Sequence, residues 1–387
     1  MFKVLTLNNI AQVGLDRLAS DRYQIGTSIA DPDAVLVRSA DMHKLEIPAS
    51  LKAVGRAGAG VNNIPVAKMS AKGIPVFNAP GANANAVKEL VICGLVIACR
   101  QIVDAVDFAR DLKGTDEELH KAVEAGKKNF AGFELPGRTL VVVGLGAIGR
   151  LVANAGVAMG MHVIGFDPGL TVEGAWQLSS AVKKARSLDD ALRAADFVTV
   201  HVPLADATRK LISAERLQLM KTGVVVLNFA REGIIDEAAV VAAIDAGKVH
   251  SYVSDFPTNL TKNHKRCVTL PHLGASTAEA EDNCAIMVAD QVSDFLENGN
   301  IRNAVNFPEV VVPRNTPHRV VCANANVPNM LGQISEAFGH AGLNIHDMAN
   351  SSRGELAYTV IDLDAPVPPA LVTQIAAIDG IVMVRMV

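Results

Sequence analysis

A glycine-rich turn more than a third of the way along the chain constrains the fold more than any other feature. The run Val141–Arg150 reads as a buried strand, a tight turn and the start of a helix. Within it, Gly144, Gly146 and Gly149 have the G-x-G-x-x-G spacing, and Asp167 ends a second apolar strand eighteen residues later. Glycines at this spacing allow the bend, a close approach of pyrophosphate and helix–strand packing, while the acid receives ribose hydroxyls. The sequence therefore predicts a dinucleotide-binding domain with another domain of similar size before it.

Length, charge and composition narrow the class of protein. A chain of 387 residues can hold two or three domains, and half of its residues are hydrophobic. The net charge is −4 and no basic run stands out, so we expect neither nucleic acid nor a membrane surface as a partner. No apolar stretch reaches the roughly 18 residues of a membrane span, and residues 1–7 read as a strand rather than a signal peptide. We therefore expect a cytoplasmic protein.

The five cysteines are odd in number and scattered. This pattern is typical of reduced thiols in the cytoplasm and gives no metal-ligand spacing, so we predict no metal site. Cys93 and Cys99 share an apolar helix, where the simplest interpretation is that they are small core residues.

Short apolar strands alternate with helical segments in residues 1–85 and again in 140–270, with Gly and Pro at the strand ends. This pattern indicates two doubly wound parallel-sheet domains, an α/β fold, and six strands in the second stretch complete a dinucleotide domain. The segment 84–110 predicts one long buried helix, and the polar segment 112–139 is expected to project as an arm. A second long helix is expected over 277–298.

Residues 318–387 have a separate pattern. The expected order is a strand at His318–Ala323, a helix at Met330–His340, two strands from Asn344 onward, a helix at Pro369–Ala377 and a last strand. The order β-α-β-β-α-β is that of a ferredoxin-like module.

Polar residues at the carboxyl ends of the predicted strands suggest a redox reaction on a small acid. Arg231 follows one strand of the dinucleotide domain and His272 follows another. A guanidinium can grip a substrate carboxylate in two places, and an imidazole can give or take the proton of a neighbouring alcohol. A surface ion pair for Arg231 and simple packing for His272 are the alternatives. His201 also ends a strand, where it either lines the cofactor or has a structural role.

Together with these residues, nearly the whole chain resembles a known family, the D-isomer-specific 2-hydroxyacid dehydrogenases. The resemblance rests on the glycine turn and on the segments Arg56–Ile64, Asn78–Gly81, Glu134–Arg138, Asn228–Asp236 and Pro271–Thr277. It implies a substrate-binding domain split into 1–93 and 285–309, an NAD-binding domain at 94–284, a linker at 310–317, and an ACT domain, a ferredoxin-like module that often binds an amino-acid effector, at 318–387.

The resemblance also implies roles for individual residues. Arg231 would hold the substrate carboxylate and His272 would be the general acid/base. Asp167 favours NAD over NADP, because a carboxylate repels a 2′-phosphate. The expected cofactor contacts are Gly144, Gly146, Ala147, Ile148, Gly149, Asp167, His201, Val202, Pro203, Thr208, Phe229, Ala230, Asp255, Gly274 and Ala275. The expected substrate contacts are Arg38, Ser39, Arg56, Ala57, Gly58, Ala59, Gly60, Asn78 and Ser276, with the two arginines as partners for a phosphate.

Two positions depart from the family pattern. Asn259 stands where relatives place the glutamate that holds the catalytic histidine, and a one-residue shift would put Leu260 there. Because asparagine cannot stabilise an imidazolium by charge, we expect a rate profile shifted to lower pH. In the ACT-like segment the usual Pro-Gly turn is Pro328-Asn329. The resemblance places effector contacts, for L-serine, at Asn324, Asn326 and Asn344.

The resemblance implies NAD-dependent oxidation of D-3-phosphoglycerate to 3-phosphooxypyruvate, the entry to serine synthesis, by a homodimer or homotetramer. One alternative is a different D-2-hydroxyacid, as in hydroxypyruvate, glyoxylate or D-lactate metabolism. Another is a regulator that binds NAD or an amino acid without catalysis, because the usual glutamate is missing.

Overall fold

The computed structural model describes all 387 residues, and they form two compact units. The terminal unit consists of Met1–Asn83 and Ala278–Val387, and the central unit of Ala84–Thr277. The chain crosses between them at the first residues of helices α3 (Ala84–Arg100) and α11 (Ala278–Asn298). The boundaries expected at 93/94 and 284/285 fall inside these helices. No helix combines the length and the apolar content needed to cross a bilayer.

The first half of the terminal unit is a parallel sheet in the order β2-β1-β3-β4-β5, a doubly wound arrangement. Helix α11 packs closely on it because small residues leave room. A Cβ added at Gly55 would lie 2.6 Å from Val288, and one added at Gly14 would lie 2.5 Å from the backbone of Ala285. The elements are β1 (Phe2–Leu7), α1 (Gln12–Leu15), β2 (Tyr23–Gly26), β3 (Ala34–Val37), β4 (Ala53–Arg56), α2 (Val66–Ala71) and β5 (Val76–Phe77).

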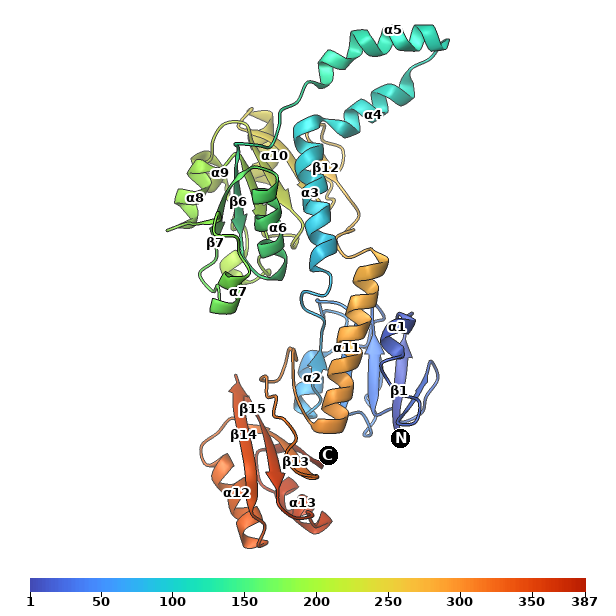
Figure 1. The fold of residues 1–387 in the computed structure, drawn as a ribbon, viewed down its shortest axis with the longest axis vertical. Coiled ribbons are helices and arrows are strands. Elements are labelled where there is room, and N and C mark those ends of the chain that lie inside the picture. Colours follow the sequence, from blue (N-terminus) through green and yellow to red (C-terminus); the bar gives the residue numbers. More distant parts are fainter. The chain divides into compact units, whose positions relative to one another are not determined.

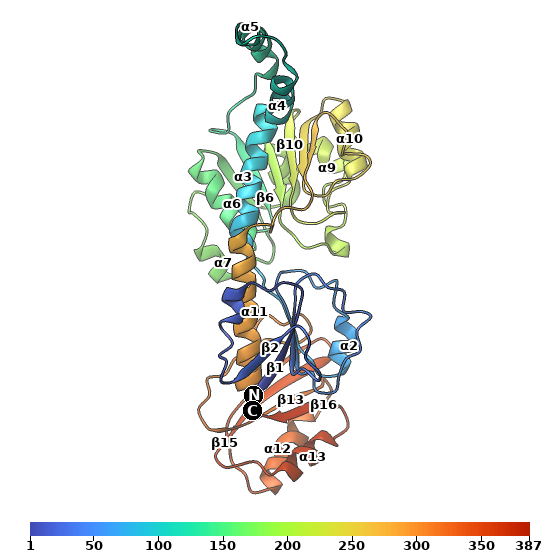
Figure 2. The same ribbon diagram turned by 90° about the vertical axis from the view of Figure 1, so that its right-hand side faces the viewer.

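The C-terminal module of the terminal unit (residues 318–387) is an antiparallel sheet in the order β14-β15-β13-β16, which confirms the ferredoxin-like prediction. Figure 2 shows α12 and α13 together on one face of this sheet, where they cover Val320, Cys322 and Ile361. Val321 and Tyr358 on the other face join the core that contains α11. The elements are β13 (His318–Ala325), α12 (Met330–His340), β14 (Ile345–Arg353), β15 (Leu356–Leu363), α13 (Pro369–Ala376) and β16 (Ile381–Met386).

The carboxyl end of α11 is bound by side chains from the C-terminal module and the segment before it. The last four carbonyl groups of a helix have no partner within the helix, and cations are favoured beside them. Here three guanidinium groups and one phenol supply the donors. These bonds run from Arg385 to the carbonyls of Phe295 and Leu296, from Arg314 to Glu297, from Arg319 to Asn298, and from Tyr358 to Gly299. The module is therefore fastened to the helix that completes the first sheet.

Arg319 is the most buried of the three arginines and forms a two-pronged ion pair with Asp362. Nε and Nη2 lie 2.6 and 2.8 Å from the two carboxylate oxygens, and both side chains are fully buried. Nη1 and Nη2 also donate to the carbonyls of Asn298, Val312 and Pro313. Burial is the largest single influence and would raise the pKa of Asp362, but the hydrogen bonds from Arg319 and from the Asn315 N–H, together with the charges of Arg319 and Arg314, outweigh it and hold the pKa below its usual range. This pair is satisfied on every side.

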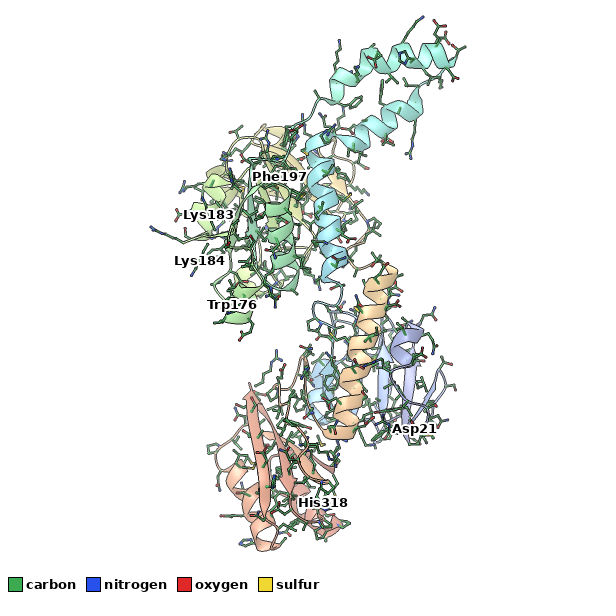
Figure 3. All side chains as sticks on the ribbon, viewed as in Figure 1. Asp21, Trp176, Lys183, Lys184, Phe197 and His318 are labelled. Atoms are coloured by element: carbon green, nitrogen blue, oxygen red, sulfur yellow. The ribbon has the colours of Figure 1, made fainter.

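The central unit is a seven-stranded parallel sheet in the order β12-β11-β10-β9-β6-β7-β8. The six strands from β11 to β8 in this list have the strand order of a dinucleotide-binding domain, and β12 adds a seventh strand at one edge. The prediction of six strands missed β8, whose two residues, Lys183 and Lys184, project at the other edge (Figure 3). Lysines on an edge strand discourage pairing with another sheet. The strands are β6 (Thr139–Val143), β7 (His162–Phe166), β8 (Lys183–Lys184), β9 (Phe197–Val200), β10 (Val224–Asn228), β11 (Val249–Ser254) and β12 (Cys267–Thr269).

The prediction of one helix over 84–110 is wrong. Gln101 adopts a left-handed conformation with φ of 48°, which ends α3 and starts α4 (Ile102–Asp111) in a new direction. Helix α5 (Asp116–Gly126) then begins at a capping box between Thr115 and Glu118. Figure 1 shows α4 and α5 extending away from the sheet of their unit, so the arm is longer than expected. The other helices are α6 (Ala147–Ala158), α7 (Val172–Trp176), α8 (Leu188–Ala194), α9 (Ala214–Leu219) and α10 (Glu237–Asp245).

Replacing Arg319 with methionine should destabilise the terminal unit by about 3–5 kcal/mol, because it leaves the buried Asp362 carboxylate without its cationic partner. Urea unfolding measures this loss. The double variant R319M/D362L, which removes both charges, should recover most of it, because an apolar pair of similar volume carries no desolvation cost. An R319M protein as stable as the wild type would show that the pair does not hold the module in place.

Candidate active site

The glycine turn between β6 and α6 is built from three glycines with different tasks. Gly144 has φ of +90°, and a Cβ there would lie 2.6 Å from the carbonyl oxygen of His201. A Cβ at Gly149 would lie 1.9 Å from the carbonyl oxygen of Gly144. By contrast, a Cβ at Gly146 would meet no atom within 4 Å. The first and third glycines are therefore required by the fold, whereas the second leaves open space above the turn.

The open space at Gly146 lies at the start of α6, whose N-cap has no side-chain acceptor. The first N–H groups of the helix, at Ala147 and Ile148, can therefore bind an anion. Asp167, at the end of β7, is held beside the turn. Its Oδ2 accepts the N–H of Leu145 and its Oδ1 accepts the N–H of Gly169, both at 2.8 Å. A fixed carboxylate next to a helix N-terminus suits a ribose next to a pyrophosphate.

His201 lies behind the turn as a neutral side chain. Its Nε2 is 3.0 Å from Thr199 Oγ1, and its Nδ1 is inaccessible to solvent and has no partner. Burial lowers the pKa of His201 to about 4. Thr208 stabilises the segment 203–208 that follows, because its hydroxyl donates a hydrogen bond of 2.6 Å to the carbonyl of Pro203. The backbone of His201 supports the turn, and Val202 contacts Gly144 from the same side.

The ends of β11 and β12 bring His272 and Asp255 together. The N–H of His272 donates to the carbonyl of Asp255 at 2.9 Å, and its exposed ring packs on Phe256 at 4.9 Å. His272 has φ of +48°, in the left-handed region that is uncommon for non-glycine residues. Asp255 is 1% exposed; its Oδ2 accepts the N–H of Gly274, and its Oδ1 has no partner. Burial raises the pKa of Asp255, and the nearby charges of His272 and Arg231 oppose the rise.

Arg231 follows β10 on a loop that Asn228 holds in shape. The Asn228 side chain donates to the carbonyl of Arg231 at 2.9 Å and accepts the N–H of Ala230 at 3.1 Å. The Arg231 guanidinium is exposed. Its Nη1 donates a hydrogen bond to the carbonyl of the preceding residue, Ala230. Sequence reasoning missed Asn228 as a positioning residue; a polar residue ending a wholly apolar strand was the available signal. Phe229, expected at the cofactor, is buried with its ring against Gly94.

Asn259 is an exposed residue of the turn 259–263 and makes no hydrogen bond to the His272 ring. Leu260 beside it is also exposed. Neither position therefore supplies a group that holds the imidazole in this structure. Ala275 and Ser276 follow Gly274 on the loop that leads to the end of the unit.

In the terminal unit, the carboxyl ends of β3, β4 and β5 gather most of the predicted substrate residues. Arg56 Nε donates to the carbonyl of Arg38 at 3.0 Å. Gly58, with φ of +150°, lies so close to the Arg56 guanidinium that a Cβ there would be 1.8 Å from Nη1. Asn78 Nδ2 donates to the carbonyl of Ala59 at 2.6 Å, which fixes the loop from Ala57 to Gly60. Ser39 N–H donates to the side chain of Asn8.

The three predicted effector asparagines do not lie together in the C-terminal module. Asn324 and Asn326 lie at the end of β13, where the side chain of Asn326 donates to the carbonyl of Gly354. Asn344 lies at the opposite end of the module, bonded to Asp364 at 2.6 Å. Asn324 is 2% exposed and its Oδ1 has no partner. Asn329 adopts φ of 67°, so the turn that usually contains glycine is kept.

Comparison with known proteins identifies relatives of this chain. Residues 102–274 match the family model of the D-isomer specific 2-hydroxyacid dehydrogenase NAD-binding domain. A relative from Schizosaccharomyces pombe, provisionally named D-3-phosphoglycerate dehydrogenase, is 32% identical over 95% of this chain and 84% of its own. D-3-phosphoglycerate dehydrogenase from Methanocaldococcus jannaschii is 37% identical over 73% of this chain, and the match spans 53% of that protein.

Among solved structures, NAD⁺-bound 3-phosphoglycerate dehydrogenase from Entamoeba histolytica has a TM-score of 0.61 at 23% identity. The match covers 79% of this chain and 98% of that one, and it supports the fold.

The fold and the site define an NAD-binding dehydrogenase of two doubly wound units. The chain belongs to the D-isomer-specific 2-hydroxyacid dehydrogenases.

Two glycine substitutions separate folding from cofactor binding. Gly149→Ala should destabilise the central unit by several kcal/mol, because the new methyl group collides with backbone. Gly146→Ala should change the free energy of unfolding by no more than about 1 kcal/mol, since it meets no atom and only weakens an N-cap. It should nevertheless weaken NAD binding at least about tenfold, because the methyl group fills the space for the pyrophosphate. Thermal unfolding and NAD titration measure the two effects; wild-type NAD affinity in Gly146→Ala would contradict this assignment.

Proposed function

We propose that this chain oxidises D-3-phosphoglycerate to 3-phosphooxypyruvate with NAD, the first step from that acid toward serine. The observation that carries the proposal is the grouping of Arg231, His272 and a buried Asp255 on neighbouring strand ends of the NAD-binding unit. The names of the relatives from S. pombe and M. jannaschii support the choice of substrate.

Each residue has a task that its surroundings allow. Only Nη1 of the Arg231 guanidinium donates a hydrogen bond, to the carbonyl of Ala230. The remaining N–H donors would hold the substrate carboxylate in a two-pronged contact. The exposed imidazole of His272 would take the proton from the C2 hydroxyl during oxidation and return it during reduction. Its ring is steadied by Phe256 and its backbone by Asp255.

The residues present fit NAD. The uncapped first turn of α6 and the open space at Gly146 suit the pyrophosphate, and Asp167 suits a ribose without a 2′-phosphate. The unpaired Oδ1 of Asp255 is a candidate acceptor for an amide N–H of the nicotinamide. When bound, NAD accepts the hydride from C2 of the substrate. Arg38 and Arg56 of the terminal unit are the candidate partners of the substrate phosphate.

We also propose regulation and self-association for the chain. The buried, unpaired Oδ1 of Asn324 supports binding of L-serine at that end of the C-terminal module. Helix α4 buries none of its side chains and exposes Ile102, Val103 and Val106, which favours a homodimer or homotetramer joined through the arm. The cytoplasm is the proposed location, in keeping with free thiols at all five cysteines.

A panel of D-2-hydroxyacids tests the function. NADH formation should be fastest with D-3-phosphoglycerate and weaker by orders of magnitude with D-glycerate and D-lactate, because only the first offers a phosphate to the arginines. Arg231→Ala and His272→Ala should abolish turnover. A preference for unphosphorylated acids would remove the phosphoglycerate assignment, and inactivity on all acids would favour a non-catalytic regulator.

The exposed Asn259 gives a prediction about pH. Asn259→Glu tests the role that the family resemblance implies for this position: a carboxylate that reaches the His272 ring would stabilise the imidazolium and move the midpoint of the pH–rate profile for oxidation upward. Asn259→Gln, which has the same length as glutamate without the charge, is the control and should leave the profile in place. Profiles that coincide in all three proteins would show that position 259 does not act on His272.

A further inference from the structure

The side chain of Arg38 already has an anionic partner within its own unit. Its Nη2 lies 2.5 Å from Oε1 of Glu281, which is in the first turns of α11. The two side chains are 38% and 40% exposed, so the pair is open to solvent and to a competing anion. Cys284, one turn further along α11, is buried, and the charges of Arg56, Arg38 and Glu281 all act on its thiol. The arginines and Glu281 therefore form one cluster.

The backbone of Arg38 is fixed, whereas its guanidinium can exchange partners. The Arg38 carbonyl accepts hydrogen bonds from Arg56 Nε at 3.0 Å and from Asn63 Nδ2 at 3.4 Å. The guanidinium makes a single contact with Glu281, although it has five N–H donors. A phosphate could therefore replace the carboxylate without any movement of the strand end.

We propose that Glu281 is an internal competitor for the phosphate-binding Arg38 and so sets the affinity for the phosphate of the substrate. The inference rests on the proposed function. A phosphate monoester carries nearly two negative charges and three acceptor oxygens, so it displaces a single carboxylate. A neutral hydroxymethyl group cannot, and Arg38 then stays with Glu281. The exchange lowers the affinity for phosphorylated acids and leaves that for unphosphorylated acids unchanged.

The chain supplies a matched control on the same helix. Glu279 is also in the first turn of α11, is exposed, and has no ion-pair partner. Both glutamates interact favourably with the helix dipole, so neutralising either one has the same effect on α11 itself. Only Glu281 contacts Arg38, and a difference between the two variants therefore reports on the pair.

Steady-state kinetics of the full-length protein tests the proposal. Glu281→Gln should lower KM for D-3-phosphoglycerate about two- to fivefold, the range expected for loss of a partly exposed competing ion pair. KM for D-glycerate should stay unchanged, and so should both constants in Glu279→Gln. An unchanged or raised KM for D-3-phosphoglycerate in Glu281→Gln, or an equal fall in KM for both acids, would overturn the proposal.

Binding of inorganic phosphate separates this proposal from the assigned reaction. Calorimetry should show phosphate binding two- to fivefold tighter to Glu281→Gln than to the wild type or Glu279→Gln. That result in a protein inactive on D-3-phosphoglycerate would reject the reaction and keep Glu281 as the competitor. Equal phosphate affinity in all three proteins would reject the role of Glu281, whatever the activity.

Discussion

The carbonyl groups at the carboxyl end of α11 are the feature on which the terminal unit depends. Burying these carbonyls without partners would cost free energy. They accept hydrogen bonds from the side chains of Arg314, Arg319, Tyr358 and Arg385. Because these donors come from the segment before the C-terminal module and from three of its strands, capping the helix and docking the module are one event. Strands β13 and β15 of the antiparallel sheet are thereby buried along almost their whole length, and one face of the sheet becomes part of the core that α11 shares with the first sheet.

The same helix connects this structural role to chemistry. Its carboxyl end is fastened by arginines, while Glu281 near its amino end holds the arginine proposed to bind phosphate. In the central unit, the residues of the glycine turn have separate roles. Gly144 and Gly149 are required by backbone clearance, Gly146 leaves open space above the turn, and two backbone N–H groups hold the Asp167 carboxylate beside it. The residues left exposed or unpaired, such as Arg231 and Asp255 Oδ1, are those assigned to substrate and cofactor.

Features carried by local pattern could be predicted from the sequence. The glycine turn, the two parallel sheets and the ferredoxin-like module each have a periodicity or a turn signal, and the fold class follows from them. Features set by distant partners could not. The pairing of Arg319 with Asp362 joins residues 43 positions apart, β8 has no apolar signal, and the left-handed Gln101 has no glycine to mark it. The roles of Asn259, Asn324 and the substrate arginines stay predictions, because they depend on ligands.

In the proposed reaction, the chain removes a hydride from C2 of D-3-phosphoglycerate while His272 takes the hydroxyl proton. The most direct test is oxidation of D-3-phosphoglycerate carrying deuterium at C2, with NMR or mass analysis of the reduced cofactor. We predict that all the deuterium appears on the nicotinamide, with none in water, and that the L-isomer gives no product. Deuterium released to solvent, or no reduced cofactor from the D-isomer, would contradict the account.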